Sequence, residues 1–292
     1  MKRTKNPEFM FILSVFIFGT LGPFVRNSPV SSGELALYRA ILAVVLIGVY
    51  LAVTGQKIPF GEIRNSIPLL LISGAAIGFN WVLLFEAYKL TTITAATLSY
   101  YFAPVIVTVL SPVLFREKIT AKQWICFIMS TLGIVLITGF ERLSGDRNHI
   151  LGIAFGLGAA CFYAAVILLN KYIRNVDGIH RTLLQFLASI AVMIPYVALT
   201  GGVTIGNADA RGLMFILIIG IFHTGITYCM YFSSLKELPG QKVAILSYID
   251  PLVAVMISVF ILGEELTPMQ ALGGALILGF TLWNEITPGK RE

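Results

Sequence analysis

Long apolar runs separated by short polar segments make up most of the chain. A helix needs about 20 mostly apolar residues to cross a bilayer, and ten runs approach or reach that length. Their predicted limits are 8–25, 34–54, 66–87, 94–115, 122–140, 150–171, 181–200, 212–234, 241–262 and 268–286. The runs are continuous rather than alternating between apolar and polar positions, which favours helices over a β-barrel. The pattern therefore predicts an all-α integral membrane protein with ten transmembrane helices.

Composition supports the membrane assignment and narrows the chemistry. Of the 292 residues, 57% are hydrophobic and 12% are charged, whereas soluble domains carry about 25% charged residues. The net charge of +6 is spread over short segments and both termini, so no basic face for nucleic acid is expected. The three cysteines lie inside apolar runs, with no metal-ligand cluster around them. We expect membrane lipids as partners, and no nucleic acid, metal, cofactor or obligate protein partner.

The basic residues predict how the chain is oriented. If the N-terminus is inside, the internal segments hold fifteen of the 21 Lys and Arg residues and the external segments hold five, while Arg39 lies within a span. Cytoplasmic loops of membrane proteins carry such an excess of basic residues. We therefore predict a multi-pass protein of the cell (plasma) membrane with both termini in the cytoplasm.

The two halves of the chain share a sequence pattern at an offset of 147 residues. The matching positions are Pro104, Ser111, Glu117, Thr120 and Gln123 in the first half, and Pro251, Ser258, Glu264, Thr267 and Gln270 in the second. Each half has five predicted spans, and an odd number forces the second half to insert upside down. We therefore predict two inverted five-helix repeats, over residues 1–145 and 146–292.

With these motifs in place, the chain resembles the EamA-type branch of the drug/metabolite transporter superfamily. The resemblance is carried by residues 95–123 leading to Gly133, by residues 243–270 leading to Gly273 and Gly274, and by the Tyr38-Arg39 pair. It implies that spans 1–4 and 6–9 surround a central cavity, with spans 5 and 10 packed outside. It also implies the export of amino acids or other small metabolites.

Asp250 and His223 are the titratable residues nearest the middle of predicted spans. An ionised carboxylate at the bilayer centre costs about 2.5–3.5 kcal/mol, and such residues are usually functional. Asp250 is therefore a candidate proton or substrate-amine site, although it could instead cap backbone groups that Pro251 frees. Counted from the turn near residue 238, His223 lies at a similar depth. It could form a proton relay with Asp250, or be a neutral histidine bonded to a carbonyl group.

A second set of polar and aromatic residues is predicted at mid-membrane depth. These candidates for lining a substrate cavity are Asn80, Trp81, Tyr100, Tyr101, Thr227, Tyr228, Ser247 and Tyr248. Pro104 and Pro251 are predicted helix breaks whose freed carbonyl groups could face the cavity. Aromatic residues also occur in interface belts and in helix packing, so this structural role is the alternative for each aromatic candidate.

Arg39 and Glu86 both fall near the external ends of their predicted spans. One hypothesis is a gate pair that closes the external side. The alternative is that each side chain reaches the membrane interface or stabilises the fold.

These features together predict a secondary transporter that works by alternating access on zwitterionic or moderately apolar solutes, with proton coupling as an option. A nucleotide-binding Gly-x-x-x-x-Gly-Lys-[Ser/Thr] motif is absent from the sequence. A drug or cation exporter is the alternative, although the small four-span relatives resemble one another through a Glu in the first span and none occurs between Phe9 and Val25. An intramembrane enzyme is the remote alternative, because Asp250 has no second mid-span Asp and His223 has no metal-ligand companion. We therefore expect no enzymatic activity.

Overall fold

The computed structural model describes residues 6–56, 63–115, 120–138, 147–173, 176–235, 237–238 and 240–286. Within these ranges all regular secondary structure is helical. The first half contains α1 (Pro7–Gly19), α2 (Leu21–Arg26), α3 (Ser32–Thr54), η1 (Arg64–Ser66), α5 (Ile67–Leu90), α6 (Ile93–Tyr100), α7 (Ala103–Phe115) and α8 (Ala121–Thr138). The second half contains α9 (Arg147–Tyr172), α10 (Gly178–Thr200), η3 (Ile205–Asn207), α11 (Ala210–Leu217), the π-helix η4 (Ile218–Ile226), α12 (Thr227–Leu235), α13 (Gly240–Ser247), α14 (Ile249–Phe260) and α15 (Pro268–Ile286).

These helices form ten transmembrane segments within the described part of the chain, as predicted from the hydrophobic runs. Four of the segments are composite: α1–α2, α6–α7, α11–η4–α12 and α13–α14. Seven segments are long and apolar enough to cross a membrane by length and composition, and two shorter apolar helices cover 121–137 and 245–260.

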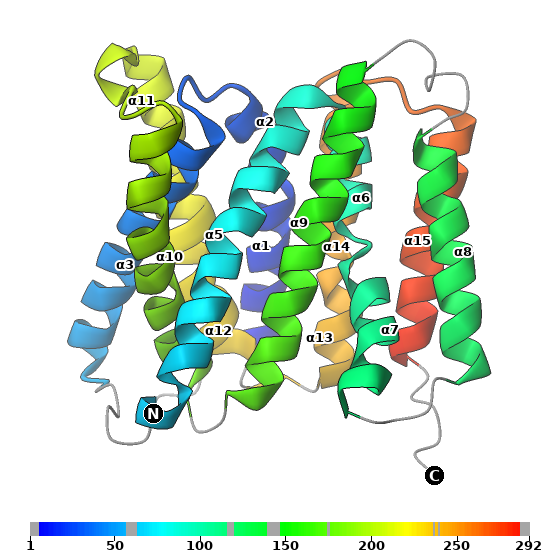
Figure 1. The fold of residues 1–292 in the computed structure, drawn as a ribbon, viewed down its shortest axis with the longest axis horizontal. Helices are drawn as coiled ribbons and strands as arrows, with labels where there is room; N and C mark the ends of the chain where they lie inside the picture. Colours follow the sequence, from blue (N-terminus) through cyan, green and yellow to red (C-terminus); the bar gives the residue numbers. More distant parts are fainter. Residues whose placement is uncertain are drawn as a thin grey trace.

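The second group of five segments is inverted relative to the first. Figure 1 shows that α1 begins and α15 ends at the same end of the bundle, which we call the terminal end. The first span starts there and finishes at the opposite, distal end, whereas α9 starts at the distal end. The fold is therefore two inverted five-helix repeats. The predicted boundary near residue 145 lies outside the described residues, as does Glu117.

The fourth and ninth spans are interrupted at equivalent positions. The break between α6 and α7 has Tyr101 at φ −70°, ψ 4°, and the break between α13 and α14 has Tyr248 at φ −72°, ψ −8°. The two tyrosines are related by the 147-residue offset, and Pro104 and Pro251 each follow three residues later. Proline lacks an N–H donor and its ring displaces the carbonyl four residues before it, which accounts for both breaks.

The repeated Thr-x-x-Gln sequence forms a capping box at the start of the last helix of each repeat. In α8, the Thr120 N–H donates to Gln123 Oε1 (2.7 Å) and the Gln123 N–H donates to Thr120 Oγ1 (3.3 Å). In α15, the same two bonds join Thr267 and Gln270, both at 3.2 Å.

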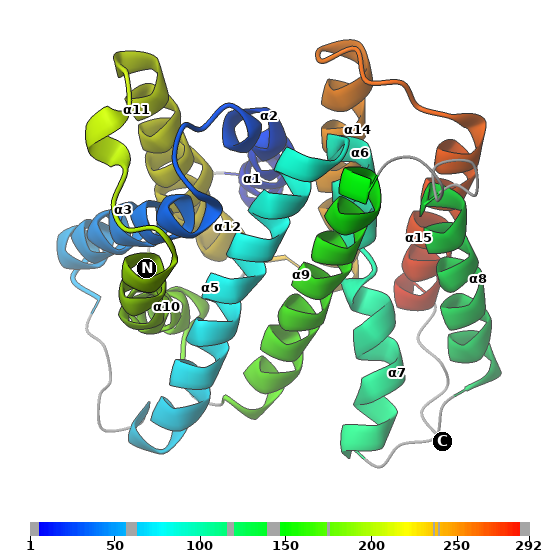
Figure 2. The same ribbon diagram turned by 45° about the horizontal axis from the view of Figure 1, so that its top comes forward.

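These two capped helices pack against each other at one edge of the bundle, as Figures 1 and 2 both show. The contact is close because glycines face each other. A Cβ atom at Gly133 would lie 2.6 Å from the Gly273 carbonyl oxygen, and one at Gly273 would lie 2.5 Å from the Gly133 oxygen. The fifth and tenth spans therefore form a tight pair to one side of the other eight.

Candidate functional site

A cavity of about 360 Å³ lies between the two repeats. Its lining residues come from α1, α2, α3, α5, α6, α9, α10, α12, α13 and α14 and from the break at Tyr101. Among the described residues none from α8 or α15 contributes, so spans 1–4 and 6–9 surround the cavity as the family resemblance implied. The lining extends from Leu21 and Tyr88 toward the distal end to Arg181 and Leu235 toward the terminal end. Its volume suits a small metabolite.

Aromatic rings form much of the cavity wall. The ring of Phe186 lies 5.0 Å from that of Trp81 and 5.3 Å from that of Tyr228, with edge-to-face geometry in both pairs. Tyr100 and Tyr163 have ring centroids 5.3 Å apart on the opposite wall of helices α6 and α9. Such rings bury apolar substrate surface and can also hold a cation against their faces.

Asp250 places a carboxylate on this cavity. It lies in the first turn of α14, directly after the break at Tyr248, where the helix dipole favours a negative charge. The Tyr101 hydroxyl donates a 2.6 Å hydrogen bond to Asp250 Oδ2. Asp250 and Tyr101 also line a second cavity of about 290 Å³. The Asp250–Tyr101 pair therefore lies between the two cavities.

Arg39 places a guanidinium on the main cavity. Its side chain is 3% exposed. The Nε–H donates to Thr224 Oγ1 at 2.7 Å, and the guanidinium carbon lies 4.2 Å from the centre of the Trp81 ring. The predicted gate partner is elsewhere: within the described ranges Arg39 makes no ion pair with Glu86. Arg39 is thus a cavity residue held by neutral neighbours.

His223 makes no direct hydrogen bond with Asp250 among the described residues, although counting along the helices places them at similar depth. It belongs to the π-helix η4, where its Nε2 lies 2.9 Å from Thr20 Oγ1 and its Nδ1 lies 3.4 Å from the Ile218 carbonyl oxygen. Its ring packs 4.9 Å from that of Phe24. His223 thus has the carbonyl contact of the alternative reading, and a proton relay with Asp250 stays a prediction.

The other predicted cavity residues divide into three groups. Asn80, Trp81, Tyr100, Tyr101, Tyr228 and Ser247 line the main cavity. Tyr248 and Pro104 line the second cavity. Thr227 lines neither, because it is fully buried and its hydroxyl donates to the Phe222 carbonyl oxygen at 2.6 Å. Pro251 is buried in α14, one residue beyond Asp250.

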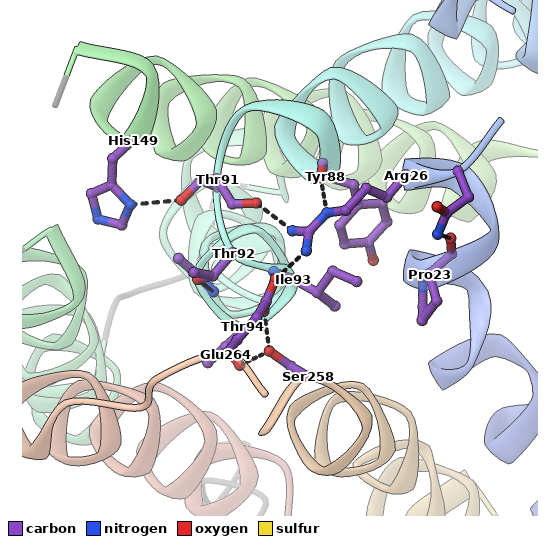
Figure 3. Close-up of polar contacts among 12 residues, drawn as sticks. Pro23, Arg26, Tyr88, Thr91, Thr92, Ile93, Thr94, His149, Ser258 and Glu264 are labelled. Carbon is purple, nitrogen blue, oxygen red and sulfur yellow. Dashed lines mark hydrogen bonds and ion pairs between the residues drawn. The ribbon is translucent and has the colours of Figure 1, made fainter. Parts of the chain in front are cut away.

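A polar cluster lies at the distal end of the bundle (Figure 3). We call Arg26, Tyr88, Thr91, Ile93, Thr94, His149, Ser258 and Glu264 the distal cluster. Arg26 forms an ion pair with Glu264 and donates to two carbonyl oxygens at the end of α5, those of Tyr88 (3.0 Å) and Thr91 (2.6 Å). The first span is thereby joined to the third and ninth.

Glu264 is the centre of the distal cluster. Besides Arg26, its carboxylate accepts from the Ser258 hydroxyl and from the backbone N–H of Ile93 (2.9 Å), the first residue of α6. A carboxylate at this place caps a helix N-terminus and interacts favourably with the helix dipole. The Glu of the repeated motif, to which sequence reasoning assigned no role, therefore joins the two repeats.

Sequence reasoning also missed two amides of the cavity, Asn170 on α9 and Gln185 on α10. The signal was available, because both are polar residues inside predicted spans and buried polar groups need partners. No group of three or more His, Cys, Asp or Glu residues in the described ranges could hold a metal ion.

Comparison with known proteins agrees with this architecture. The EamA-like transporter family matches residues 6–139 and again residues 150–284. The "uncharacterized transporter YxxF" of Bacillus subtilis is 30% identical over 278 residues, covering 94% of this chain and 88% of that protein. An "uncharacterized transporter" of Archaeoglobus fulgidus is 28% identical over 288 residues, with 95% and 96% covered.

A solved crystal structure has the same fold, with a TM-score of 0.66, 15% identity and 97% of both chains covered. The two family matches account for nearly the whole chain, and each falls on one of the inverted repeats described above. The protein is therefore a multi-pass membrane transporter that belongs to the EamA-like transporter family.

Proposed function

We propose that this transporter exports amino acids or related zwitterionic metabolites by alternating access. The observation that carries the proposal is the pair of opposite charges on one cavity. Arg39 and Asp250 both line it, and each is held only by neutral groups among the described residues. A carboxylate at Arg39 and an ammonium group at Asp250 would satisfy both residues at once.

The second part of the proposal concerns the direction of access. The cavity extends toward the terminal end, which the excess of basic residues assigns to the cytoplasm. The distal end is closed by the distal cluster, in which the Glu264 side chain is only 11% exposed. At the terminal end, Lys242 and Glu8 form an ion pair whose side chains are 43% and 44% exposed. The ion pair at the distal end is therefore less exposed than the one at the terminal end, which supports a conformation that loads solute from the cytoplasm.

The proposed cycle follows from these two ends. Solute enters from the terminal end and pairs with Arg39 and Asp250, which removes two unpaired charges from the cavity. Separation of Arg26 from Glu264 then opens the distal end. Because Asp250 also borders the second cavity, a proton could reach it when the substrate leaves, which would couple export to a proton gradient. The sequence contains no nucleotide-binding motif for another energy source.

The test measures how strongly unlabelled compounds compete with labelled alanine for transport in proteoliposomes, with and without a pH gradient. Neutral amino acids should compete, whereas the matched amines that lack the carboxylate and the matched acids that lack the amine should fail. Amines that compete as well as amino acids would instead indicate a cation exporter that uses Asp250 alone. Transport of none of these compounds would contradict the proposal.

A further inference from the structure

Two amide side chains, of which Gln185 is buried, meet in the part of the cavity nearer the terminal end. Gln185 of α10 and Asn170 of α9 both line the cavity, and Gln185 is only 3% exposed. The Gln185 Nε2 donates to Asn170 Oδ1 at 2.8 Å and to Ser73 Oγ of α5 at 2.7 Å. Three helices therefore hold one hydrogen-bonded group at the cavity wall.

Ser73 links the Gln185 amide to α5. In the structure the Ser73 hydroxyl donates to the Leu70 carbonyl oxygen at 3.2 Å, and its oxygen accepts from Gln185 Nε2. A hydroxyl donates one hydrogen and accepts through two lone pairs, so both bonds can form together. The second N–H of the same nitrogen occupies Asn170 Oδ1, which orients the Asn170 amide in turn.

This arrangement leaves one acceptor and one donor group unused. Gln185 Oε1 and Asn170 Nδ2 have no hydrogen-bond partner among the residues that the structure describes. Both amides border a cavity large enough for a solute. The unused groups therefore indicate a binding position for something that donates and accepts together.

We propose that Gln185 and Asn170 form a subsite for a neutral carboxamide side chain of the substrate. Such a side chain offers an oxygen to Asn170 Nδ2 and an N–H to Gln185 Oε1. The proposal rests on the proposed function, because Arg39 and Asp250 would hold the backbone carboxylate and amine of the same molecule.

The subsite predicts that the transporter prefers an amino acid with a carboxamide side chain over an apolar amino acid of similar shape. Asparagine should compete with labelled alanine at least tenfold more strongly than leucine, and glutamine at least tenfold more strongly than methionine. A site whose polar groups are left unpaired by the apolar analogue discriminates strongly against it. In Gln185→Leu, the asparagine-to-leucine and glutamine-to-methionine ratios should fall close to one, each measured against alanine in the same variant.

Two further variants separate recognition from folding. Ser73→Ala keeps Gln185 but removes the acceptor that orients it, so the ratios should fall partway, even if Gln185→Leu does not fold. Asn284→Leu is the matched control, because Asn284 of α15 donates to Thr108 (3.1 Å) and is not a cavity residue. Its ratios should equal those of the unmodified protein.

The outcomes distinguish this inference from the proposed function. If amino acids compete but the ratios are near one in the unmodified protein, the carboxamide subsite is wrong and amino acid transport stands. If the ratios are high but are unchanged in both Gln185→Leu and Ser73→Ala, recognition lies elsewhere and the subsite is also wrong. If no amino acid competes, both proposals fail together.

Discussion

Replacing Glu264 with glutamine is expected to open the distal end of the transporter. In the structure this carboxylate is paired with Arg26, accepts from Ser258 and caps the first N–H of α6 at Ile93. Glutamine has nearly the same shape but no charge. The variant therefore weakens the distal cluster without leaving a hole, and it should shift the population toward the conformation in which that end is open.

The magnitude follows from the exposure of the two partners. The side chain of Arg26 is 31% exposed and that of Glu264 is 11% exposed, so loss of the ion pair should cost about 0.5–1 kcal/mol. Weakening the bonds from Ser258 and Ile93 to a charged acceptor should add about 1 kcal/mol. A total of about 1.5–2 kcal/mol corresponds to a roughly 10–30-fold change in the ratio of closed to open molecules.

Thiol labelling measures this ratio directly. Leu84 is 5% exposed and lines the cavity near its closed distal end, so Leu84→Cys can report access from the distal side once the three native cysteines are replaced. An impermeant reagent added on that side should label the Glu264→Gln protein roughly ten times faster. The matched control is Glu265→Gln, which removes an exposed neighbouring charge. Equal labelling rates in both variants would refute the reasoning.

Four further predictions test other parts of the structure. Asp250→Asn should insert normally but lose accumulation driven by a pH gradient, and undiminished accumulation in vesicles would remove Asp250 from the coupling. Arg39→Lys keeps the charge but loses the planar contact with Trp81, so the KM for amino acids should rise about tenfold or more, while that for any transported amine should not. Gly133→Leu should lower the thermal unfolding temperature, because its side chain would collide with the α15 backbone, and the substrate ratios should stay unchanged. Thr267→Ala removes one capping box and should cost about 1 kcal/mol in chemical unfolding, with no change in transport.

The ten segments and their inversion could be predicted because they depend on local sequence. Apolar length determines a span, and the repeated prolines mark the breaks near Tyr101 and Tyr248. The resemblance of the two halves then implies opposite directions, since each half crosses the membrane an odd number of times. None of these steps requires knowledge of which helices are neighbours.

The site was harder to predict because it depends on which way each side chain points around its helix axis. Depth can be counted at 1.5 Å per residue, and that count placed His223 level with Asp250. Which way a side chain points depends on packing, and the π-helix that contains His223 changes the rotation per residue. Arg39 likewise becomes a cavity residue only because Trp81 and Thr224, distant in sequence, surround it.

The tight pair of α8 and α15 sets a mechanical condition on the transport cycle. At Gly133 and Gly273 a Cβ atom would lie 2.6 Å and 2.5 Å from the carbonyl oxygen of the facing glycine, so this contact has no room for a side chain. One of these helices belongs to each repeat, so we expect this edge to move least in the proposed alternating-access cycle. A rotation of the repeats about this edge would produce displacements that grow with distance from it. Opening is expected to be largest on the far side of the bundle, at α3, α10 and α11, which Figure 1 places opposite the pair.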